Sequence, residues 1–348
     1  MTSPLFVTRD ETLLDELLRL AAAAGVTPDV AHDGVAALRG WTGASLVLVG
    51  ADVAEEVART LPPRRDGVHV VVWGESPAEL FRTALALGAE NVAGLPGSGP
   101  WVVESLTDAG DDSPVRGLTF GVVGGSGGAG ATTLACALGQ LAARSGTAVV
   151  VDLDPLGPGI DRVLGLEAVE GVRWDELCQT TGRLSARALR EALPRRVGLG
   201  ALTWTSGPHG SLQPFAVREA LSAAQRGHEQ VVLDLPRLRD PVVDEVVARC
   251  DRVLVVVAPS VAGVASAARV CAGFADRSSL RLVVRGHGVE PRDITRVTGV
   301  PVVACMADQR GLAESIDLGL GPVRSRRGPL GRAAIAVLDD LRAIRAAA

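Results

Sequence analysis

A glycine-rich segment between an apolar run and a helical pattern constrains the fold of this chain more than any other feature. The apolar run 118–123 (LTFGVV) is followed by GGSGGAGATT at 124–133, and a helical pattern extends over 132–144. A glycine-rich turn between a strand and a helix lets successive backbone N–H groups point at an anion, and the helix N-terminus adds a positive partial charge. Glycine is required because a Cβ would hold the anion away from the backbone. The segment therefore predicts a phosphate-binding loop in an α/β domain.

Two kinds of phosphate loop fit these glycines. Gly125, Gly127 and Gly130 match the G-x-G-x-x-G fingerprint of dinucleotide-binding domains, and Asp152 follows about twenty residues later at the end of the next apolar run. This pattern predicts an NAD(P)-binding oxidoreductase. The rival pattern is longer and involves later parts of the chain.

The segment 126–133 (SGGAGATT) resembles the loop Lys-Gly-Gly-x-Gly-Lys-Thr-Thr of the MinD/ParA-type P-loop ATPases, with both lysines replaced. Three later runs also resemble strands and switch segments of that family: 149–154 (VVVDLD), 231–236 (VVLDLP) and 253–259 (VLVVVAP). The resemblance covers about residues 118 to 322. Within the family it is strongest to the CpaE/TadZ branch and to the actinobacterial septum site-determining (Ssd) proteins. We prefer this interpretation to the dinucleotide one because it explains more of the chain.

The resemblance implies a nucleotide site for ATP and Mg²⁺. The residues that it assigns to the phosphate loop are Gly125, Ser126, Gly127, Gly128, Gly130, Ala131, Thr132 and Thr133. It assigns the Mg²⁺ hydroxyl to Thr132, two carboxylates near the metal to Asp152 and Asp234, and the catalytic carboxylate that orients the attacking water to Asp154. The three acids end apolar runs, and ligands bind at the carboxyl edge of a parallel sheet.

Both family lysines are missing, and all 35 basic residues of this chain are arginine. Ala131 stands where a lysine neutralises the β- and γ-phosphates, and Ser126 stands where the signature lysine reaches the nucleotide of the other subunit. Arg285 replaces an asparagine that often reads the adenine. A cation against a polyphosphate acts most strongly in the transition state. We therefore expect weakened ATP binding and severely reduced hydrolysis. Candidate substitute cations are Arg144, Arg162 and Arg173, although the sequence places none of them over the loop.

The first part of the chain predicts a separate α/β domain. Apolar runs alternate with helical patterns at 11–24 and 77–87, and the segment 88–96 (GAENVAGLP) resembles the end of a receiver domain of two-component regulators. Gly50 stands where a receiver carries its phospho-accepting Asp, and Leu95 stands where it carries a Lys. We expect a degenerate receiver-like domain at 1–106 that is not phosphorylated and contacts proteins, a linker at 107–117, and the MinD/ParA-like domain at 118–348.

Charge and composition bear on partners and location. The formal net charge of −5 gives no electrostatic footprint for nucleic acid. The one-faced helix predicted at 330–346 is expected to pack on its own domain, with peripheral membrane contact as the alternative. The resemblance implies a homodimer, protein partners in cell division or pilus and secretion assembly, and a cytoplasmic protein recruited to a pole, the septum or the inner membrane face. Three hypotheses stay open: a spatial regulator with a degenerate site, an active switch ATPase, and an NAD(P) oxidoreductase.

Overall fold

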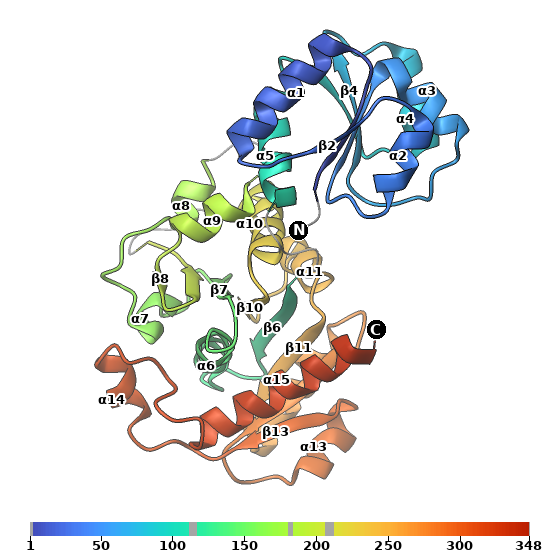
Figure 1. Cartoon of the computed structure of the whole chain (residues 1–348). Helices are drawn as coiled ribbons and strands as arrows, with labels where there is room; N and C mark the ends of the chain where they lie inside the picture. The colour runs from blue at the N-terminus through green and yellow to red at the C-terminus, as the bar shows by residue number, and fades with distance from the viewer. Residues whose placement is uncertain (1–2, 111–116, 180–183, 206–211, 348) are drawn as a thin grey trace. The chain divides into compact units, whose positions relative to one another are not determined.

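The computed structural model describes residues 3–110, 117–179, 184–205 and 212–347. The chain divides into two compact units, Met1–Pro114 and Val115–Ala348 (Figure 1). Each unit has its own parallel sheet and its own hydrophobic core, so each is described by itself.

The first unit is a five-stranded parallel sheet in the order β2-β1-β3-β4-β5. Its elements are β1 (Leu5–Val7), α1 (Glu11–Ala24), β2 (Asp29–Ala31), α2 (Gly34–Trp41), β3 (Val47–Gly50), α3 (Ala51–Arg59), β4 (Val68–Trp73), α4 (Ala78–Leu87), β5 (Asn91–Leu95) and α5 (Gly99–Gly110). This strand order is the flavodoxin-like one that receiver domains share. The receiver-like fold class is confirmed.

The predicted linker at 107–117 begins inside a helix. Residues 107–110 form the last turn of α5, and Gly117 already donates its N–H to the carbonyl of Gln225 at 2.8 Å. The remaining linker positions, 111–116, lie outside the described residues. The composition of 107–110 suggested a linker, but this turn continues a helix whose earlier residues Val102 and Leu106 are fully buried.

The second unit is an eight-stranded sheet in the order β13-β12-β11-β6-β10-β7-β9-β8, parallel except for the pairing of β8 with β9. Its strands are β6 (Leu118–Gly124), β7 (Ala148–Asp152), β8 (Arg195–Arg196), β9 (Leu199–Leu202), β10 (Gln230–Leu235), β11 (Arg252–Val257), β12 (Leu280–Arg285) and β13 (Val302–Met306). Its helices are α6 (Ala131–Ala142), α7 (Ile160–Leu164), α8 (Trp174–Leu177), α9 (Ala186–Ala192), α10 (Pro214–Gly227), α11 (Pro241–Val247), α12 (Val261–Ala272), α13 (Pro291–Thr298), α14 (Leu312–Asp317) and α15 (Pro329–Ala347).

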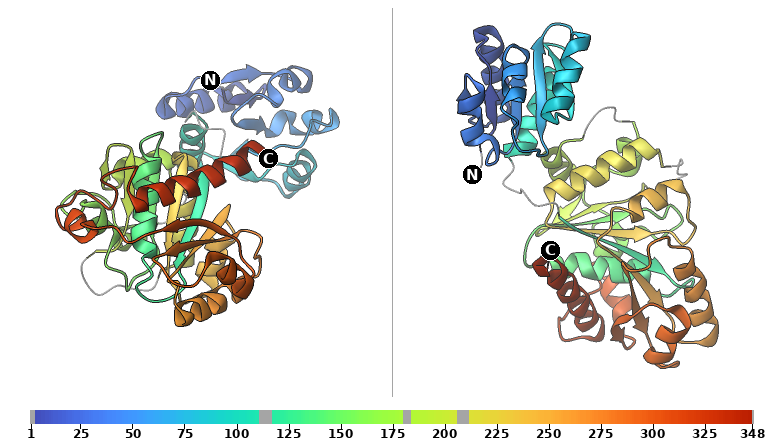
Figure 2. Two further views of the ribbon diagram at one scale, coloured as in Figure 1. Left: turned by 90° about the horizontal axis from the view of Figure 1, so that it is seen from below. Right: turned by 90° about the vertical axis from the view of Figure 1, so that its right-hand side faces the viewer.

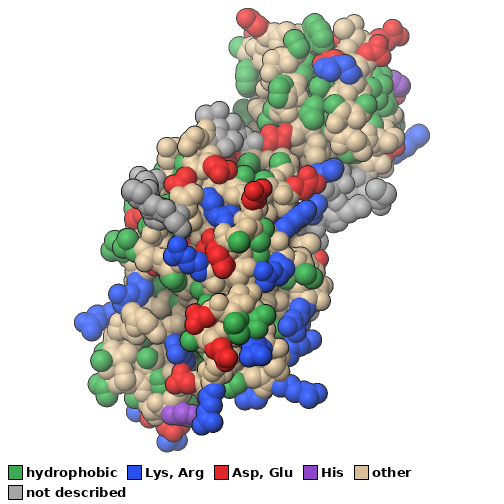
Figure 3. All heavy atoms as spheres, turned by 90° about the vertical axis from the view of Figure 1, so that its left-hand side faces the viewer, with side chains coloured by type: hydrophobic (Ala, Val, Ile, Leu, Met, Phe, Trp, Pro, Cys, Tyr) green, Lys and Arg blue, Asp and Glu red, His purple; other side chains and the backbone are tan. Residues whose placement is uncertain are grey.

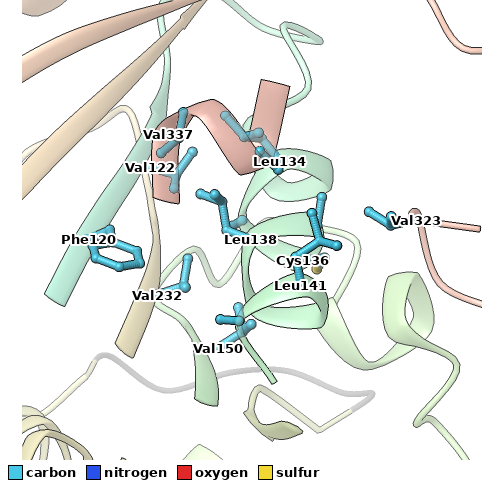
Figure 4. Close-up of a cluster of buried hydrophobic side chains, with 14 of the residues drawn as sticks. Phe120, Val122, Leu134, Cys136, Leu138, Leu141, Val150, Val232, Val323 and Val337 are labelled. Carbon is cyan, nitrogen blue, oxygen red and sulfur yellow. The ribbon is translucent and has the colours of Figure 1, made fainter. Parts of the chain in front are cut away.

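Helices cover both faces of this sheet (Figure 2). The central strands are therefore apolar on both sides, which is typical of a parallel sheet that is buried on both faces. On one face, Phe120, Val150 and Val232 of the sheet pack against Leu134 and Leu138 of α6 (Figure 4). The other face packs against α10 and α12. Helix α6 thus starts at the phosphate loop and is held in place by the core.

The C-terminal helix α15 packs on its own unit, as expected. Its buried side chains belong to the core around α6 and include Leu330, Ala334, Val337, Leu338 and Leu341. In the described part of the chain, no helix combines the length and the apolar character that crossing a membrane requires.

Candidate nucleotide site

The phosphate loop connects the end of β6 to the start of α6. The N–H of Gly125 donates to the carbonyl of Val256 in β11 at 2.8 Å, which fixes the start of the loop to the neighbouring strand. Gly128 and Gly130 have positive φ angles of 69° and 95°, a conformation that disfavours other residues. No atom lies within 4 Å of the position that a Cβ on Gly127 or Gly128 would take, so the middle of the loop borders open space.

The start of α6 provides donors for an anion. The first N–H groups of a helix have no intrahelical acceptor, and here they follow a loop that contains no side chain larger than that of serine. The helix also adds its positive partial charge at this end. The predicted loop residues therefore lie together in one turn that can receive a phosphate.

Two of the predicted acids lie side by side at the carboxyl edge of the sheet. Asp234 at the end of β10 is in register with Asp152 at the end of β7, and both side chains are almost completely buried. Burial and, to a smaller extent, the neighbouring Asp152 together raise the pKa of Asp234 to about 8, although a hydrogen bond from Thr132 opposes the rise. Burial likewise raises the pKa of Asp152 to about 6. Two buried acids side by side favour a cation between or beside them.

Asp234 has a buried carboxyl oxygen whose hydrogen-bonding capacity is not satisfied. A hydrogen bond from Thr132 to the carboxyl group lowers its pKa, whereas the Oδ2 atom, which is shielded from solvent, has no hydrogen-bond partner among the described residues. A hydroxyl and a carboxylate oxygen are hard ligands of the kind that Mg²⁺ takes together with phosphate oxygens and water. Within the described residues, no group of three or more His, Cys, Asp or Glu side chains could hold a metal unaided. Thr132 and Asp234 therefore fit a Mg²⁺ ion that also binds a nucleotide.

The carboxylate of Asp152, unlike that of Asp234, is engaged in several hydrogen bonds within the protein. Its carboxylate accepts hydrogen bonds from the hydroxyl of Thr203 at 2.9 Å and from the N–H groups of Asp154 and Ile160 at 3.1 and 3.4 Å. These bonds hold the segment between β7 and α7. The metal role expected for Asp152 stays a prediction, and its hydrogen bonds assign it the structural task of shaping this segment.

Asp154 lies two residues beyond the end of β7, in a turn and half-buried. Its Oδ1 atom accepts the N–H of Leu156 at 3.0 Å, and its carbonyl accepts the N–H of Gly157 at the same distance. The catalytic role of Asp154 stays a prediction. The turn places it at the same sheet edge as Asp234.

The three arginines proposed as substitute cations do not reach the loop through any contact seen here. Arg173 pairs with Asp161 at 3.6 Å and donates to two backbone carbonyls, and Arg162 donates to the carbonyl of Pro158. Arg144 follows the C-terminal end of α6, about 18 Å of helix away from the loop, where it lines a separate cavity with Leu164 and Arg196.

Two other arginines approach the loop. Arg285, at the end of β12, donates through Nη1 to the carbonyls of Gly128 and Ala129, each at 3.4 Å, and through Nε to Asp308 at 3.1 Å. Arg237 follows β10, and its Cδ atom lies 3.8 Å from the position of a Cβ on Gly124. Sequence reasoning missed the position of Arg237, although it lies only three residues after Asp234 at the same sheet edge. That proximity was the available signal.

The strand order argues against the dinucleotide interpretation. In a dinucleotide-binding domain the strand before the glycine loop lies beside the strand that carries the ribose-binding acid. Here β10 lies between β6 and β7, so Asp152 is two strands away from the loop strand.

The receiver-like unit has no side chain at its expected phosphorylation position. A Cβ on Gly50 would lie 2.3 Å from Oδ1 of Asp52 and 2.7 Å from Oγ1 of Thr8. The Asp52 carboxylate occupies this space and is held there by the Thr8 hydroxyl at 2.8 Å and the Arg9 N–H at 2.7 Å. Asp10, three residues after the end of β1, caps α1 by accepting the N–H of Leu13.

Comparison with known proteins agrees with both units. Residues 7–117 match the family model described as Rv3660c-like, CheY-like N-terminal domain. The uncharacterized protein Rv3660c of Mycobacterium tuberculosis is 36% identical over 342 residues, which cover 95% of this chain and 96% of that protein. The chain belongs to the Rv3660c family.

Solved structures similar to this family member share the fold of its second unit. A ParA family ATPase from Chlorobium tepidum matches with a TM-score of 0.57 and 17% identity, covering 64% of this chain and 98% of that chain. The septum site-determining protein MinD of Pyrococcus horikoshii, complexed with Mg-ADP, matches with a TM-score of 0.53 and 16% identity. The match covers 66% of this chain and 97% of that chain. The second unit of this Rv3660c family member has the fold of the MinD and ParA proteins, and the first is receiver-like.

Proposed function

We propose that this chain is a spatial regulator of the MinD/ParA class that binds a Mg²⁺-nucleotide and hydrolyses it slowly or not at all. The observation that carries the proposal is the combination of an open phosphate loop with the unpartnered, buried Oδ2 atom of Asp234 beside Thr132. The chemistry of binding is present at this site, whereas Ala131 offers only a methyl group where the family supplies its catalytic cation.

The residues divide the work of binding. Backbone N–H groups of the loop and of the first turn of α6 hold the phosphates. Thr132 and Asp234 hold Mg²⁺, which neutralises charge on the phosphates when bound. The MinD structure with Mg-ADP supports this assignment through its fold. A bound Mg²⁺ would also explain the buried carboxyl group, because an ionised Asp234 needs a cation next to it.

Hydrolysis requires a positive charge that stabilises the transition state, in addition to the groups that bind the nucleotide. Charge develops on the transferred phosphoryl group in the transition state, and a fixed cation there lowers the barrier by several kcal/mol. The loop provides no such side chain. Asp154 has one oxygen committed to a turn, so orienting water falls to the other oxygen. We therefore propose a nucleotide-dependent switch or scaffold in place of a rapid ATPase.

The receiver-like unit is proposed to contact proteins without being phosphorylated, because Asp52 fills the space at Gly50. Phe81 and Leu85 on the outer side of α4 are 50% and 71% exposed and lie one helical turn apart, which gives an apolar surface. On the face of the second unit seen in Figure 3, arginine and acidic side chains are interspersed, which favours protein partners over nucleic acid.

The role that fits these properties is a septum site-determining or CpaE-like positioning factor in cell division or in pilus and secretion assembly. Its partners would be proteins of those machineries and a second copy of the chain. It would be cytoplasmic and recruited to a pole, the septum or the inner face of the membrane. Two observations support this role: the loop resembles that of the MinD/ParA-type ATPases, and the second unit shares their fold.

Calorimetric titration of the full chain with MgADP and with MgATP, alongside phosphate-release assays, tests the proposal. We expect micromolar to millimolar binding that Thr132→Ala weakens, and turnover well below that of an ordinary MinD-type ATPase. Titration with NAD⁺ and NADPH should give no heat. Binding of NAD(P) without ATP, or rapid turnover, would refute the proposed function. Imaging a fluorescent fusion of the wild type and of Thr132→Ala then shows whether position depends on nucleotide.

A further inference from the structure

The positive charge on the phosphate loop has to come from outside the loop in this chain. The loop contains no basic residue, and the two arginines beside it approach from different strands. Their contacts differ, and the difference decides which one is available to a ligand.

Arg285 is committed to the loop itself. Its Nη1 atom donates to the carbonyls of Gly128 and Ala129, and its Nε atom donates to Asp308. In a trans peptide the carbonyl and the N–H point in opposite directions. The N–H of Gly130 therefore points away from Arg285, and the N–H of Ala129 donates to the carbonyl of Ser126 within the loop. This guanidinium thus braces the loop through its carbonyl groups.

Arg237 follows β10, which lies on the opposite side of β6 from β12, and its guanidinium is not engaged by the loop. Among the described residues its guanidinium has no hydrogen-bond or ion-pair partner, and the residue is exposed. Its Cδ atom and the Cβ atom of Ala131 lie 3.8 and 3.9 Å from one and the same point, the position of a Cβ on Gly124. The stem of Arg237 thus runs beside the position where the family carries its lysine, and its charged end extends beyond Cδ.

We propose that Arg237 is a phosphate-binding residue that supplies the positive charge missing at Ala131. The inference rests on the proposed nucleotide binding and adds a specific residue to it. Arg237 lies three residues after Asp234, which is 2% exposed and has an unpartnered carboxyl oxygen, so the end of β10 and the segment that follows it supply both the metal carboxylate and the phosphate cation. A guanidinium binds two phosphate oxygens at once, which suits recognition from a loop.

The arrangement has a consequence for the switch. A lysine in the loop is fixed by the helix that follows it, whereas Arg237 belongs to the segment between β10 and α11. Phosphate binding by Arg237 therefore ties this segment, in which Leu238 is 84% exposed, to the nucleotide. Nucleotide binding should change the protection of 236–240 from hydrogen exchange in the wild type.

The test is MgATP and MgADP titration of the full chain in four forms: wild type, Arg237→Gln, Arg237→Lys and Arg144→Gln. Arg144 is a matched control, because it is exposed and lies at the far end of α6. We expect Arg237→Gln to weaken binding about 10- to 100-fold, the loss typical of one charge-assisted contact. Arg237→Lys should recover part of the affinity, and Arg144→Gln should match the wild type.

A rescue experiment separates a direct role from a structural one. Adding Ala131→Lys to Arg237→Gln places a cation in the same space from the helix side and should restore affinity. Thermal melting of the apo forms should be unchanged, since Arg237 is exposed and its side chain makes no hydrogen bond or ion pair in the described part of the chain. Equal affinities of wild type and Arg237→Gln would overturn this inference and leave the proposed function standing, whereas absence of nucleotide binding by the wild type would overturn the proposed function itself.

Discussion

Replacing Asp234 by Asn should stabilise the nucleotide-free protein, and the gain should grow with pH. The carboxyl group of Asp234 is 2% exposed, and burial followed by the neighbouring Asp152 raises its pKa from 3.8 to about 8. Between these two pH values the folded state keeps a proton that the unfolded state has released. A folded state that binds the extra proton loses stability as the pH rises. Asn keeps the acceptor for Thr132 and cannot ionise.

The magnitude follows from the two pKa values. Each pH unit above 3.8 reduces the free energy of unfolding by about 1.4 kcal/mol until the folded carboxyl group itself ionises near pH 8. The accumulated loss at pH 7 is about 4 kcal/mol. For a unit of this size, 1 kcal/mol shifts the melting temperature by about 2–4 °C. The Asn variant should therefore melt about 10 °C above the wild type at pH 7, and the difference should shrink towards pH 4.

Thermal melts in EDTA from pH 5 to 8.5 measure this difference. Asp339→Asn is the control, because its side chain is 61% exposed in a surface pair with Arg342 and should change the melting temperature little at any pH. Saturating MgADP should reverse the order of wild type and Asp234→Asn, since the ion needs the carboxylate. Parallel pH profiles of the two proteins would show that Asp234 is not a strained acid and would refute the reasoning.

Further predictions concern the two glycine positions and the receiver-like unit. Gly50→Asp should lower the melting temperature by an amount equivalent to about 1–3 kcal/mol, because its Cβ would lie 2.3 Å from Asp52; adding Asp52→Ala should recover part of the loss. Gly130→Ala should reduce the free energy of unfolding by about 1–2 kcal/mol and weaken nucleotide binding, because φ is 95° there and Nη1 of Arg285 would lie 2.8 Å from the new methyl group. Unchanged nucleotide affinity in a calorimetric titration would contradict this prediction. Incubation of the wild type with acetyl phosphate should leave its mass unchanged by intact mass spectrometry, and a phosphate adduct on the first unit would argue against an inert receiver.

The sequence alone was sufficient for the local features. The phosphate loop at 124–133 was predictable because the pattern of glycines between an apolar run and a helical pattern is short-range. The strands that bear Asp152 and Asp234 were predictable within one or two residues, since strands buried on both faces are continuous apolar runs. The receiver-like fold followed from the same alternation. The loss of charge at Gly50 and Ala131 is a property of the sequence and needed no structure.

The tertiary structure decided which side chains meet. Two apolar runs that are distant in the chain pair as β10 and β7, and this pairing brings Asp234 beside Asp152. Burial at this edge of the sheet raises both pKa values, and the neighbouring Asp152 adds to the rise at Asp234. The same strand order separates β7 from β6, which the glycine spacing could not reveal. The tertiary structure also determines which arginines lie near the loop. Arg285 and Arg237 lie beside it. The three arginines considered from the sequence lie or form contacts elsewhere: Arg144, Arg162 and Arg173. Local periodicity determines where strands and helices begin. Which side chains lie close to the phosphate loop depends on the order in which the strands pair, and this order is a property of the tertiary structure.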